Sequence, residues 1–276
     1  MFLGARFGSR GVASAMLSGM NWLLLRGLTR EIRHWGAFPL AFAGRLPGVA
    51  VHCLDLPGVG TECRRNSPST VAAVAKDVRY RWLALAERVP PREWAVLGIS
   101  LGGMVALAWC SRHPGDFQRA VLVNTSAGGT SPPLHRFRPR SLGTFVRILS
   151  TRSQTDREEL ILAMTSAASG DGGSPVPDWV AIGADAPVAI RTLVCQLVAA
   201  ARFHAPSRLG VSTLFLASRG DLLVRPSCSE RLAYRYSAPV FIHPSAGHDL
   251  PLDDPDWVGE RVATWLASSA DRTRTS

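Results

Sequence analysis

The 276-residue chain has almost no lysine, although it is strongly basic. Lys76 is its single lysine, whereas Lys and Arg together number 31 and the formal net charge is +10. A basic balance of this size is compatible with nucleic acid, a membrane surface or an acidic ligand as partner. The arginines are, however, spread along the chain, with no basic helix or aromatic-interleaved patch. We therefore expect no nucleic-acid partner and attribute the arginine excess to a GC-rich bacterial genome.

Cysteine is scarce, and its spacing excludes two kinds of site. The five cysteines are dispersed without a C-x-x-C pair: Cys53, Cys63, Cys110, Cys195 and Cys228. An odd, scattered set argues against a disulfide framework and a zinc site, and favours a reducing compartment. No group of His, Asp and Glu residues has metal-ligand spacing. We therefore expect no metal and no other cofactor.

Long apolar runs are also absent, since none reaches the roughly 18–20 residues that span a bilayer. We expect no integral membrane segment and a cytoplasmic location. Residues 1–19 contain Arg6 and Arg10 and no acidic residue. They predict a leader, which is a weak targeting segment, a disordered stretch or the result of an upstream start codon, with the folded part beginning at Met20. The oligomeric state is left open.

Short apolar runs alternate with helical patterns along most of the chain. This rhythm predicts an α/β protein with a doubly wound, mostly parallel sheet. The expected strands are 21–25, 49–54, 94–97, 120–123, 212–217 and 239–243. The expected helices with two defined ends are 30–46, 67–88, 142–150, 187–203, 229–236 and 257–266. Two more are expected: one that ends near 113, and one that opens on a capping box formed by Thr155 and Glu158.

The region after 124 differs in character from the rest of the chain. It begins with a stretch rich in Ser, Gly, Pro and Arg, continues with shorter helical patterns, and includes a polar loop at 169–174. We interpret 129–208 as a helical cap inserted into an α/β domain that spans 20–268. Residues 269–276 are expected to form a disordered tail.

One glycine-rich segment carries the strongest functional signal. Gly98-Ile99-Ser100-Leu101-Gly102 lies between an apolar strand pattern and a helical pattern. A G-x-S-x-G sequence in that context predicts a nucleophile elbow, in which a strained turn projects the serine hydroxyl beyond the sheet. The flanking glycines leave room where strand and helix approach each other. The alternative is an ordinary glycine-rich turn.

Two later residues supply the partners that a serine nucleophile needs. Asp221 and His248 each follow an expected strand, so Ser100, Asp221 and His248 all lie at carboxyl ends of strands, where sites of parallel sheets assemble. The order Ser, Asp, His is that of this elbow architecture. His248 is then the general base and Asp221 its orienting acid. The Leu101 and Leu28 N–H groups are the predicted oxyanion donors.

Other residues compete for these roles. Taken alone, Asp221 can be a helix cap and His248 a surface histidine. Asp249, Asp253 and Asp254 are alternative acids, but we assign them to helix starts because they follow His248 so closely. Asp55 is expected to tie its loop by hydrogen bonds.

The remaining histidines divide into two groups. His135 and His204 fall in the predicted cap, where they either contact substrate or are solvated. The others are expected to be structural: His34, His52, His113 and His243.

These motifs resemble the α/β-hydrolase superfamily, in particular its capped carboxylesterase, enol-lactonase and C–C hydrolase branch. The matching segments are Arg26-Gly27, Asp55-Leu56-Pro57-Gly58-Val59-Gly60, Gly98 to Met104, Ser218 to Val224, and Gly247-His248. The resemblance implies a cofactor-free serine hydrolase whose cap forms the substrate pocket. The chain departs from the family at Arg26, where a histidine is usual. Arg26 either holds the oxyanion loop through a carboxylate or adds positive charge at the pocket mouth.

The sequence thus predicts a serine hydrolase that cleaves a carboxylic ester of a small or medium, largely apolar small molecule. Thioesters, lactones and carbon–carbon bonds are alternatives with the same triad. A binding protein on a hydrolase fold is the non-enzymatic alternative.

Overall fold

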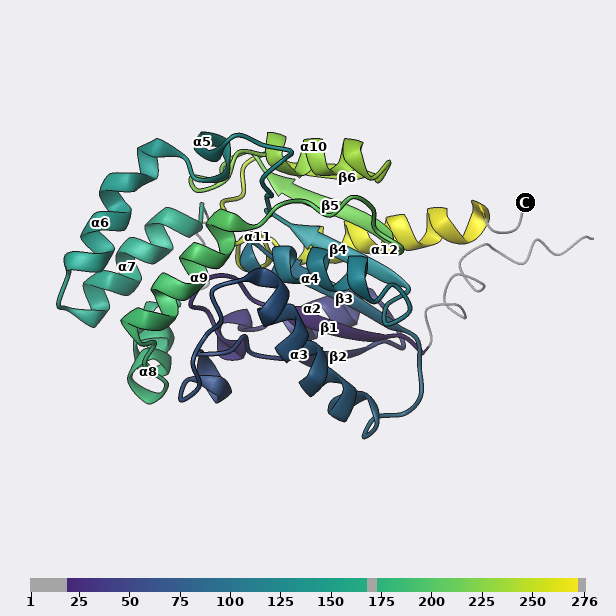
Figure 1. Cartoon of the computed structure of the whole chain (residues 1–276), viewed down its shortest axis with the longest axis horizontal. Helices are drawn as coiled ribbons and strands as arrows, with labels where there is room; N and C mark the ends of the chain where they lie inside the picture. Colours follow the sequence, from purple (N-terminus) through teal and green to yellow (C-terminus); the bar gives the residue numbers. More distant parts are fainter. Residues whose placement is uncertain (1–18, 168–172, 273–276) are drawn as a thin grey trace, which may run out of the picture.

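The computed structural model describes residues 19–167 and 173–272. Its centre is a six-stranded sheet in the order β2-β1-β3-β4-β5-β6, in which every neighbouring pair is parallel. The strands are β1 (Asn21–Leu25), β2 (Ala50–Cys53), β3 (Trp94–Ile99), β4 (Arg119–Val123), β5 (Ser212–Ser218) and β6 (Val240–His243). All six expected strands and the doubly wound α/β class are therefore confirmed. Figure 1 shows helices on both faces of this sheet.

Alternation of side chains along each strand explains the two helical layers. Successive strand residues point to opposite faces, so Leu23 and Leu25 pack with α3 (Val71–Ala86), α4 (Leu101–Arg112) and α10 (Ser227–Arg235). Trp22 and Leu24 pack on the opposite face with α2 (Phe38–Arg45) and α12 (Pro255–Arg272). Because both faces are covered, the strands are apolar throughout rather than alternating.

A helical insertion, here residues 124–211, separates β4 from β5. It contains α5 (Pro133–Arg136), the short turn η3 (Pro139–Ser141), α6 (Leu142–Ser150), α7 (Gln154–Thr165), α8 (Val176–Asp185) and α9 (Ile190–Arg202). In Figure 1, α6, α7 and α8 project beyond one end of the sheet. The insertion closes on itself at its base, where Gly128 N–H donates to Phe203 O (2.8 Å) and Ala205 N–H donates to Gly128 O (2.9 Å).

Several helix boundaries differ from the sequence-based expectation. The single helix expected at 30–46 is two elements, η1 (Ile32–Trp35) and α2, because Gly36 between them adopts a positive φ of 52°. The expected capping box is wrong: Ser153, not Thr155, caps α7, and Glu158 has another partner. Helix α9 begins at Ile190 rather than near Pro187, and α8 was not expected.

The ends of the chain also bear on the predictions. Helix α12 continues to Arg272, past the expected helix end at 266 and into the tail that was expected to be disordered. The predicted leader, apart from Gly19, and most of the polar loop at 169–174 lie outside the described residues. Within the described ranges, no single helix is long and apolar enough to cross a membrane. In the same ranges, α8 and α9 are long and apolar enough only when they are taken together, and they are bent by 109° relative to each other.

Candidate active site

Ser100 occupies a strained turn between β3 and α4. Its φ of 55° and ψ of −115° place a residue with a side chain in a region that L-amino acids rarely adopt, a feature that clusters at active sites. The turn is held from the adjacent strand, because Ser100 N–H donates to the Val123 carbonyl at 2.9 Å. Ser100 is partly exposed, so its hydroxyl is accessible at the carboxyl edge of the sheet.

The two glycines of the motif are required by close backbone contacts. A Cβ at Gly98 would lie 2.4 Å from the Gly102 carbonyl oxygen, and a Cβ at Gly102 would lie 2.2 Å from the Leu25 carbonyl oxygen. Real Cβ atoms do not approach backbone this closely, so neither position accepts a side chain without displacement. These contacts explain why the turn needs glycine on both sides of Ser100.

Asp221 and His248 are in direct contact. His248 Nδ1 and Asp221 Oδ2 are 2.7 Å apart, and both side chains are buried. The other carboxylate oxygen, Oδ1, accepts from Leu223 N–H (2.7 Å) and Val224 N–H (2.9 Å). Asp221 therefore holds the imidazole and orders the turn that follows it. It does not cap the helix that follows, because α10 begins only at Ser227.

The environment of His248 favours its charged form. Burial acts to lower the pKa of His248, but attraction and hydrogen bonding by Asp221 outweigh it, so the pKa is raised above 6.5. Asp249 acts in the same direction and Arg26 against it. An imidazole held in this way can accept a proton at Nε2 while Asp221 stabilises the charge that results.

Asn124 and Thr125, which the sequence analysis missed, connect the serine and histidine segments. The Thr125 hydroxyl donates to the Ser100 carbonyl at 2.8 Å. The buried Asn124 amide donates to the carbonyls of His248 (2.8 Å) and Gly247 (3.2 Å). The only signal in the sequence was a pair of polar residues directly after the apolar strand β4. Among the described residues the Ser100 hydroxyl itself makes no hydrogen bond, to His248 or to any other group.

The loop that follows β1 lies against Ser100. A Cβ at Gly27 would be 3.2 Å from the Ser100 Cβ. Leu28, the predicted oxyanion donor, comes next in this loop, while Leu101, the other predicted donor, is the buried first residue of α4. The two N–H groups thus belong to segments that approach each other beside the serine.

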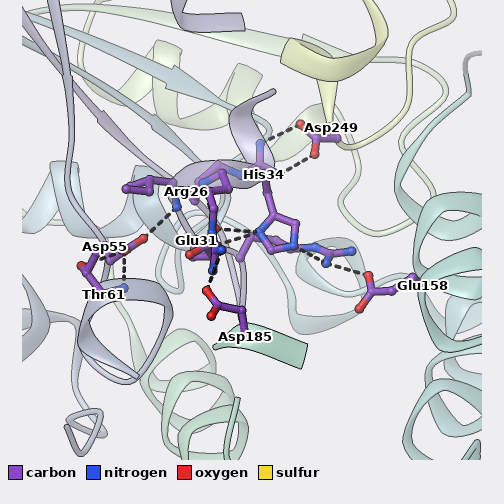
Figure 2. Close-up of polar contacts among 11 residues, drawn as sticks. Arg26, Glu31, His34, Asp55, Thr61, Glu158, Asp185 and Asp249 are labelled. Atoms are coloured by element: carbon purple, nitrogen blue, oxygen red, sulfur yellow. Dashed lines mark hydrogen bonds and ion pairs between the residues drawn. The ribbon is translucent and has the colours of Figure 1, made fainter. Parts of the chain in front are cut away.

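Arg26 has a carboxylate partner, which is one of the two roles that the sequence left open for it. Its guanidinium forms two hydrogen bonds with the Asp249 carboxylate, Nη1 to Oδ1 at 3.0 Å and Nη2 to Oδ2 at 2.6 Å, and both side chains are buried (Figure 2). Arg26 also lies over the Trp35 ring, 4.7 Å from its centroid. Arg26 therefore holds its loop through a carboxylate. Asp249 does stand at the start of a helix, α11 (Leu250–Asp253), as expected, but its side chain makes no cap bond and pairs with Arg26 instead.

The residues after Leu28 bind the helical insertion. Arg30 pairs with Glu158 of α7 at 2.8 Å and lies 4.3 Å from the Trp179 ring centroid of α8. Thr29 N–H donates to the Gln196 side chain of α9 at 2.8 Å. Arg33 pairs with Asp185 at 2.7 Å. Figure 2 shows Glu158 and Asp185 facing this loop from the insertion.

His34 is the buried histidine of this network. Its Nδ1 accepts from Glu31 N–H at 3.2 Å, and its Nε2 lies 2.9 Å from Arg30 Nη1. Burial first, and the charges of Arg30 and Arg26 second, lower the pKa of His34 to about 2. The ring is therefore neutral, and it accepts a hydrogen bond at only one of its two nitrogens.

The other acidic residues support loops, largely as expected. Asp55 accepts from Ile32 N–H, Thr61 N–H and the Thr61 hydroxyl, which confirms its role as a loop tie (Figure 2). Asp254 accepts from Trp257 N–H at the start of α12, as expected. Asp253 instead accepts from Gly247 N–H (2.6 Å), directly before His248.

The remaining histidines and the cysteines lie outside this constellation. His204 is exposed and bonds the Arg202 carbonyl, and His135 lies near the Ser227 hydroxyl. Over residues 19–167 and 173–272, no cluster of three or more His, Cys, Asp or Glu side chains could hold a metal ion. All five cysteines are free.

Comparison with known proteins identifies the family of the chain. Residues 22–261 match the sequence model of the alpha/beta hydrolase family. The chain is 26% identical over 223 residues to the Caulobacter sp. (strain K31) protein named "Putative carbamate hydrolase RutD", covering 78% of this chain and 80% of that protein. It is 34% identical over 115 residues, 39% of each chain, to the pimeloyl-[acyl-carrier protein] methyl ester esterase of Aeromonas hydrophila subsp. hydrophila.

Solved structures show the same fold. A thermophilic esterase from Thermogutta terrifontis superposes with a TM-score of 0.67 at 20% sequence identity, covering 91% of this chain and 90% of the esterase. At this identity the likeness establishes a shared fold and leaves the chemistry to be argued from the residues.

Proposed function

Because the chain belongs to the alpha/beta hydrolase family, we propose that it is a serine hydrolase that cleaves carboxylic esters with Ser100 as nucleophile, His248 as general base and Asp221 as the orienting acid. Leu101 and Leu28 N–H complete the proposal as oxyanion donors. The observation that carries it is the pairing of a strained Ser100 turn with a buried His248–Asp221 hydrogen bond of 2.7 Å on the same sheet edge.

The proposed reaction has two half-reactions. Ser100 Oγ attacks the ester carbonyl while His248 Nε2 takes its proton, and His248 then returns a proton to the leaving alcohol. In the second half-reaction, His248 takes a proton from a water molecule that attacks the acyl-enzyme carbonyl, and it returns a proton to Ser100 Oγ as the carboxylic acid leaves. In unliganded enzymes the hydrogen bond from nucleophile to base is often long and tightens with substrate, so an unbonded Ser100 hydroxyl is compatible with this scheme.

Substrate preference is assigned to the helical insertion. We propose that residues 129–208 act as a cap over the site, since Gln196, Glu158 and Trp179 of the insertion all contact the loop that carries Leu28. Apolar side chains of its helices favour a small or medium apolar acyl or alcohol group. Thioesters, lactones and carbon–carbon bonds remain as alternatives with the same triad, and the two curated relatives are named for a carbamate and for a methyl ester.

The decisive experiment is covalent labelling. A fluorophosphonate probe followed by peptide mass spectrometry is expected to modify Ser100 in the wild-type protein, and to give no label in Ser100→Ala or His248→Ala. A series of p-nitrophenyl esters from acetate to octanoate then tests the apolar preference. Labelling of another residue, or turnover retained by Ser100→Ala with a wild-type unfolding curve, would contradict the mechanism. A folded wild type without label or turnover would favour the binding-protein alternative.

A further inference from the structure

The turn that carries Leu28 is itself strained. Arg30 N–H donates weakly to the Gly27 carbonyl (3.4 Å), so 27–30 form a four-residue turn with Thr29 in its third position. Thr29 has a φ of 56°. Turns with a positive φ at that position normally place glycine or asparagine there, and a β-branched residue is a genuine outlier. Inside the turn, the Thr29 hydroxyl donates to the Leu28 carbonyl at 2.7 Å, and a contact from outside the turn adds a second restraint.

Gln196, on helix α9 of the insertion, supplies that restraint. Its Oε1 accepts from Thr29 N–H at 2.8 Å, across 167 residues of sequence. The Gln196 side chain is fully buried, at 0% exposure. The partner fixes the orientation of the carboxamide, because only the oxygen can accept from an N–H group.

The burial of Gln196 is not explained by packing alone. Within the described part of the chain, its amide nitrogen has no hydrogen-bond partner, so the bond to Thr29 is the one polar contact that this side chain makes. A buried donor without a partner costs free energy, whereas an apolar residue of similar shape would avoid that cost. The bond to Thr29 is therefore what glutamine provides here and leucine or methionine would not.

Helix α9 is seated firmly enough to act as a restraint. Thr192, one helical turn before Gln196, is buried against the loop after β2, where a Cβ on Gly58 would lie 2.6 Å from the Thr192 hydroxyl. Contact this close leaves α9 little freedom to slide over the core. The Gln196 oxygen thus has a fixed position relative to the sheet.

We propose that Gln196 is a positioning residue for the oxyanion hole, which it serves by holding the Leu28–Thr29 peptide in its strained orientation. This inference rests on the proposed function, in which Leu28 N–H is one of the two oxyanion donors. Without Gln196, rotation of the Leu28–Thr29 peptide takes Thr29 out of the left-handed region and reshapes the turn that presents Leu28 N–H. The insertion then contributes to the chemical step as well as to substrate choice.

Kinetics of matched variants test the proposal. Gln196→Met keeps the length and burial of the side chain but removes the acceptor. Loss of a whole oxyanion donor costs on the order of 10²–10³ in rate, so displacement of one is expected to lower kcat toward p-nitrophenyl butyrate by about 10–100-fold, with KM changed less than about twofold. Val194→Ala, on the exposed face of α9, is the control and should keep wild-type kcat.

A second substitution separates positioning from general damage. Glycine adopts a positive φ without steric cost, so Thr29→Gly removes the need for the restraint. Gln196→Met in the Thr29→Gly background is expected to keep kcat within about threefold of Thr29→Gly alone. Wild-type kcat in folded Gln196→Met, or a loss that Thr29→Gly does not relieve, would overturn the proposal.

Hydrogen exchange provides a readout that does not depend on activity. The Thr29 amide is expected to be protected in the wild type and to exchange at least about tenfold faster in Gln196→Met. If the wild type shows neither turnover nor fluorophosphonate labelling, the proposed function fails, while a protected Thr29 amide still supports the restraint. If Gln196→Met does not fold, hydrogen exchange in the wild type is the test. A Thr29 amide that exchanges as fast as the amides of an exposed loop would then overturn the proposal.

Discussion

Arg26 and Asp249 form a buried, bidentate ion pair that joins the two loops on either side of the candidate site. The bonds measure 3.0 and 2.6 Å, and side-chain exposure is 5% for Arg26 and 7% for Asp249. Arg26 directly precedes Gly27 of the turn that carries Leu28, and Asp249 directly follows His248. The pair therefore fixes the distance between the segment that would bind the oxyanion and the segment that would move the proton.

The first prediction concerns the contribution of the Arg26–Asp249 pair to the free energy of unfolding. Arg26→Met leaves the Asp249 carboxylate buried without a partner, and breaking a buried pair in this way costs about 3–5 kcal/mol. The double variant Arg26→Met/Asp249→Leu removes both charges and should recover most of that loss. Urea unfolding at pH 7 measures both. A single variant as stable as the wild type would contradict the assignment.

The second prediction concerns His248 and pH. Because Asp221 raises the pKa of His248 above 6.5 against the opposing effect of burial, kcat/KM is expected to rise with pH through a midpoint above 6.5. Asp221→Asn loses the charge that raises this pKa, so the midpoint should move down. It also disturbs the tautomer, and kcat should fall by about 10⁴-fold. A midpoint that stays in place, measured with a neutral ester, would exclude Asp221 as the partner.

The third prediction concerns Asn124, whose φ of 45° is positive. Asn124→Gly accepts this φ but leaves the His248 and Gly247 carbonyls without their donor, at a cost of about 1–3 kcal/mol. Asn124→Ala loses the same donor and adds about 1–2 kcal/mol of left-handed strain. The expected order of unfolding free energy is wild type, then glycine, then alanine. Equal stability of the two variants would show that the turn relaxes.

The fourth prediction concerns acid stability. His34 stays neutral in the folded protein because burial and nearby arginines lower its pKa to about 2, whereas the unfolded chain takes up a proton below 6.5. The unfolding free energy should therefore fall as pH drops below 6.5, by up to about 1.4 kcal/mol per pH unit. His34→Gln cannot titrate and should show a shallower slope between pH 6.5 and 5. Equal slopes for the two proteins would contradict the shift.

The sequence predicted the features that depend on short segments. The elbow is readable because Gly98, Ser100 and Gly102 lie within five residues, between a strand pattern and a helix pattern. Asp221 and His248 were selected as candidates because each follows an apolar strand, and parallel strands bring their carboxyl ends to one edge. Strands were easier to predict than helices, since a buried run of four to seven apolar residues is distinctive where both faces of a sheet are covered.

The contacts that the sequence did not reveal are pairings between distant residues. Arg26 and Asp249 are 223 positions apart, and Arg30 and Glu158 are 128 apart. Glu158 lies three residues after Thr155, which is the spacing of a capping box, so the sequence favours that local role. Its actual partner, Arg30, is close only in the folded chain. Asn124 was missed for a related reason, because a polar residue after a strand signals a loop but not the carbonyls that it will bind.

The base of the helical insertion has a consequence for how such proteins diversify. Gly128 forms backbone hydrogen bonds with Phe203 and Ala205, so the two ends of the insertion lie side by side where it joins the sheet. A foreign set of helices spliced at these positions would leave the strand order untouched. It would also have to supply an acceptor for the Thr29 N–H, so selectivity and turnover would be inherited together in such a chimera.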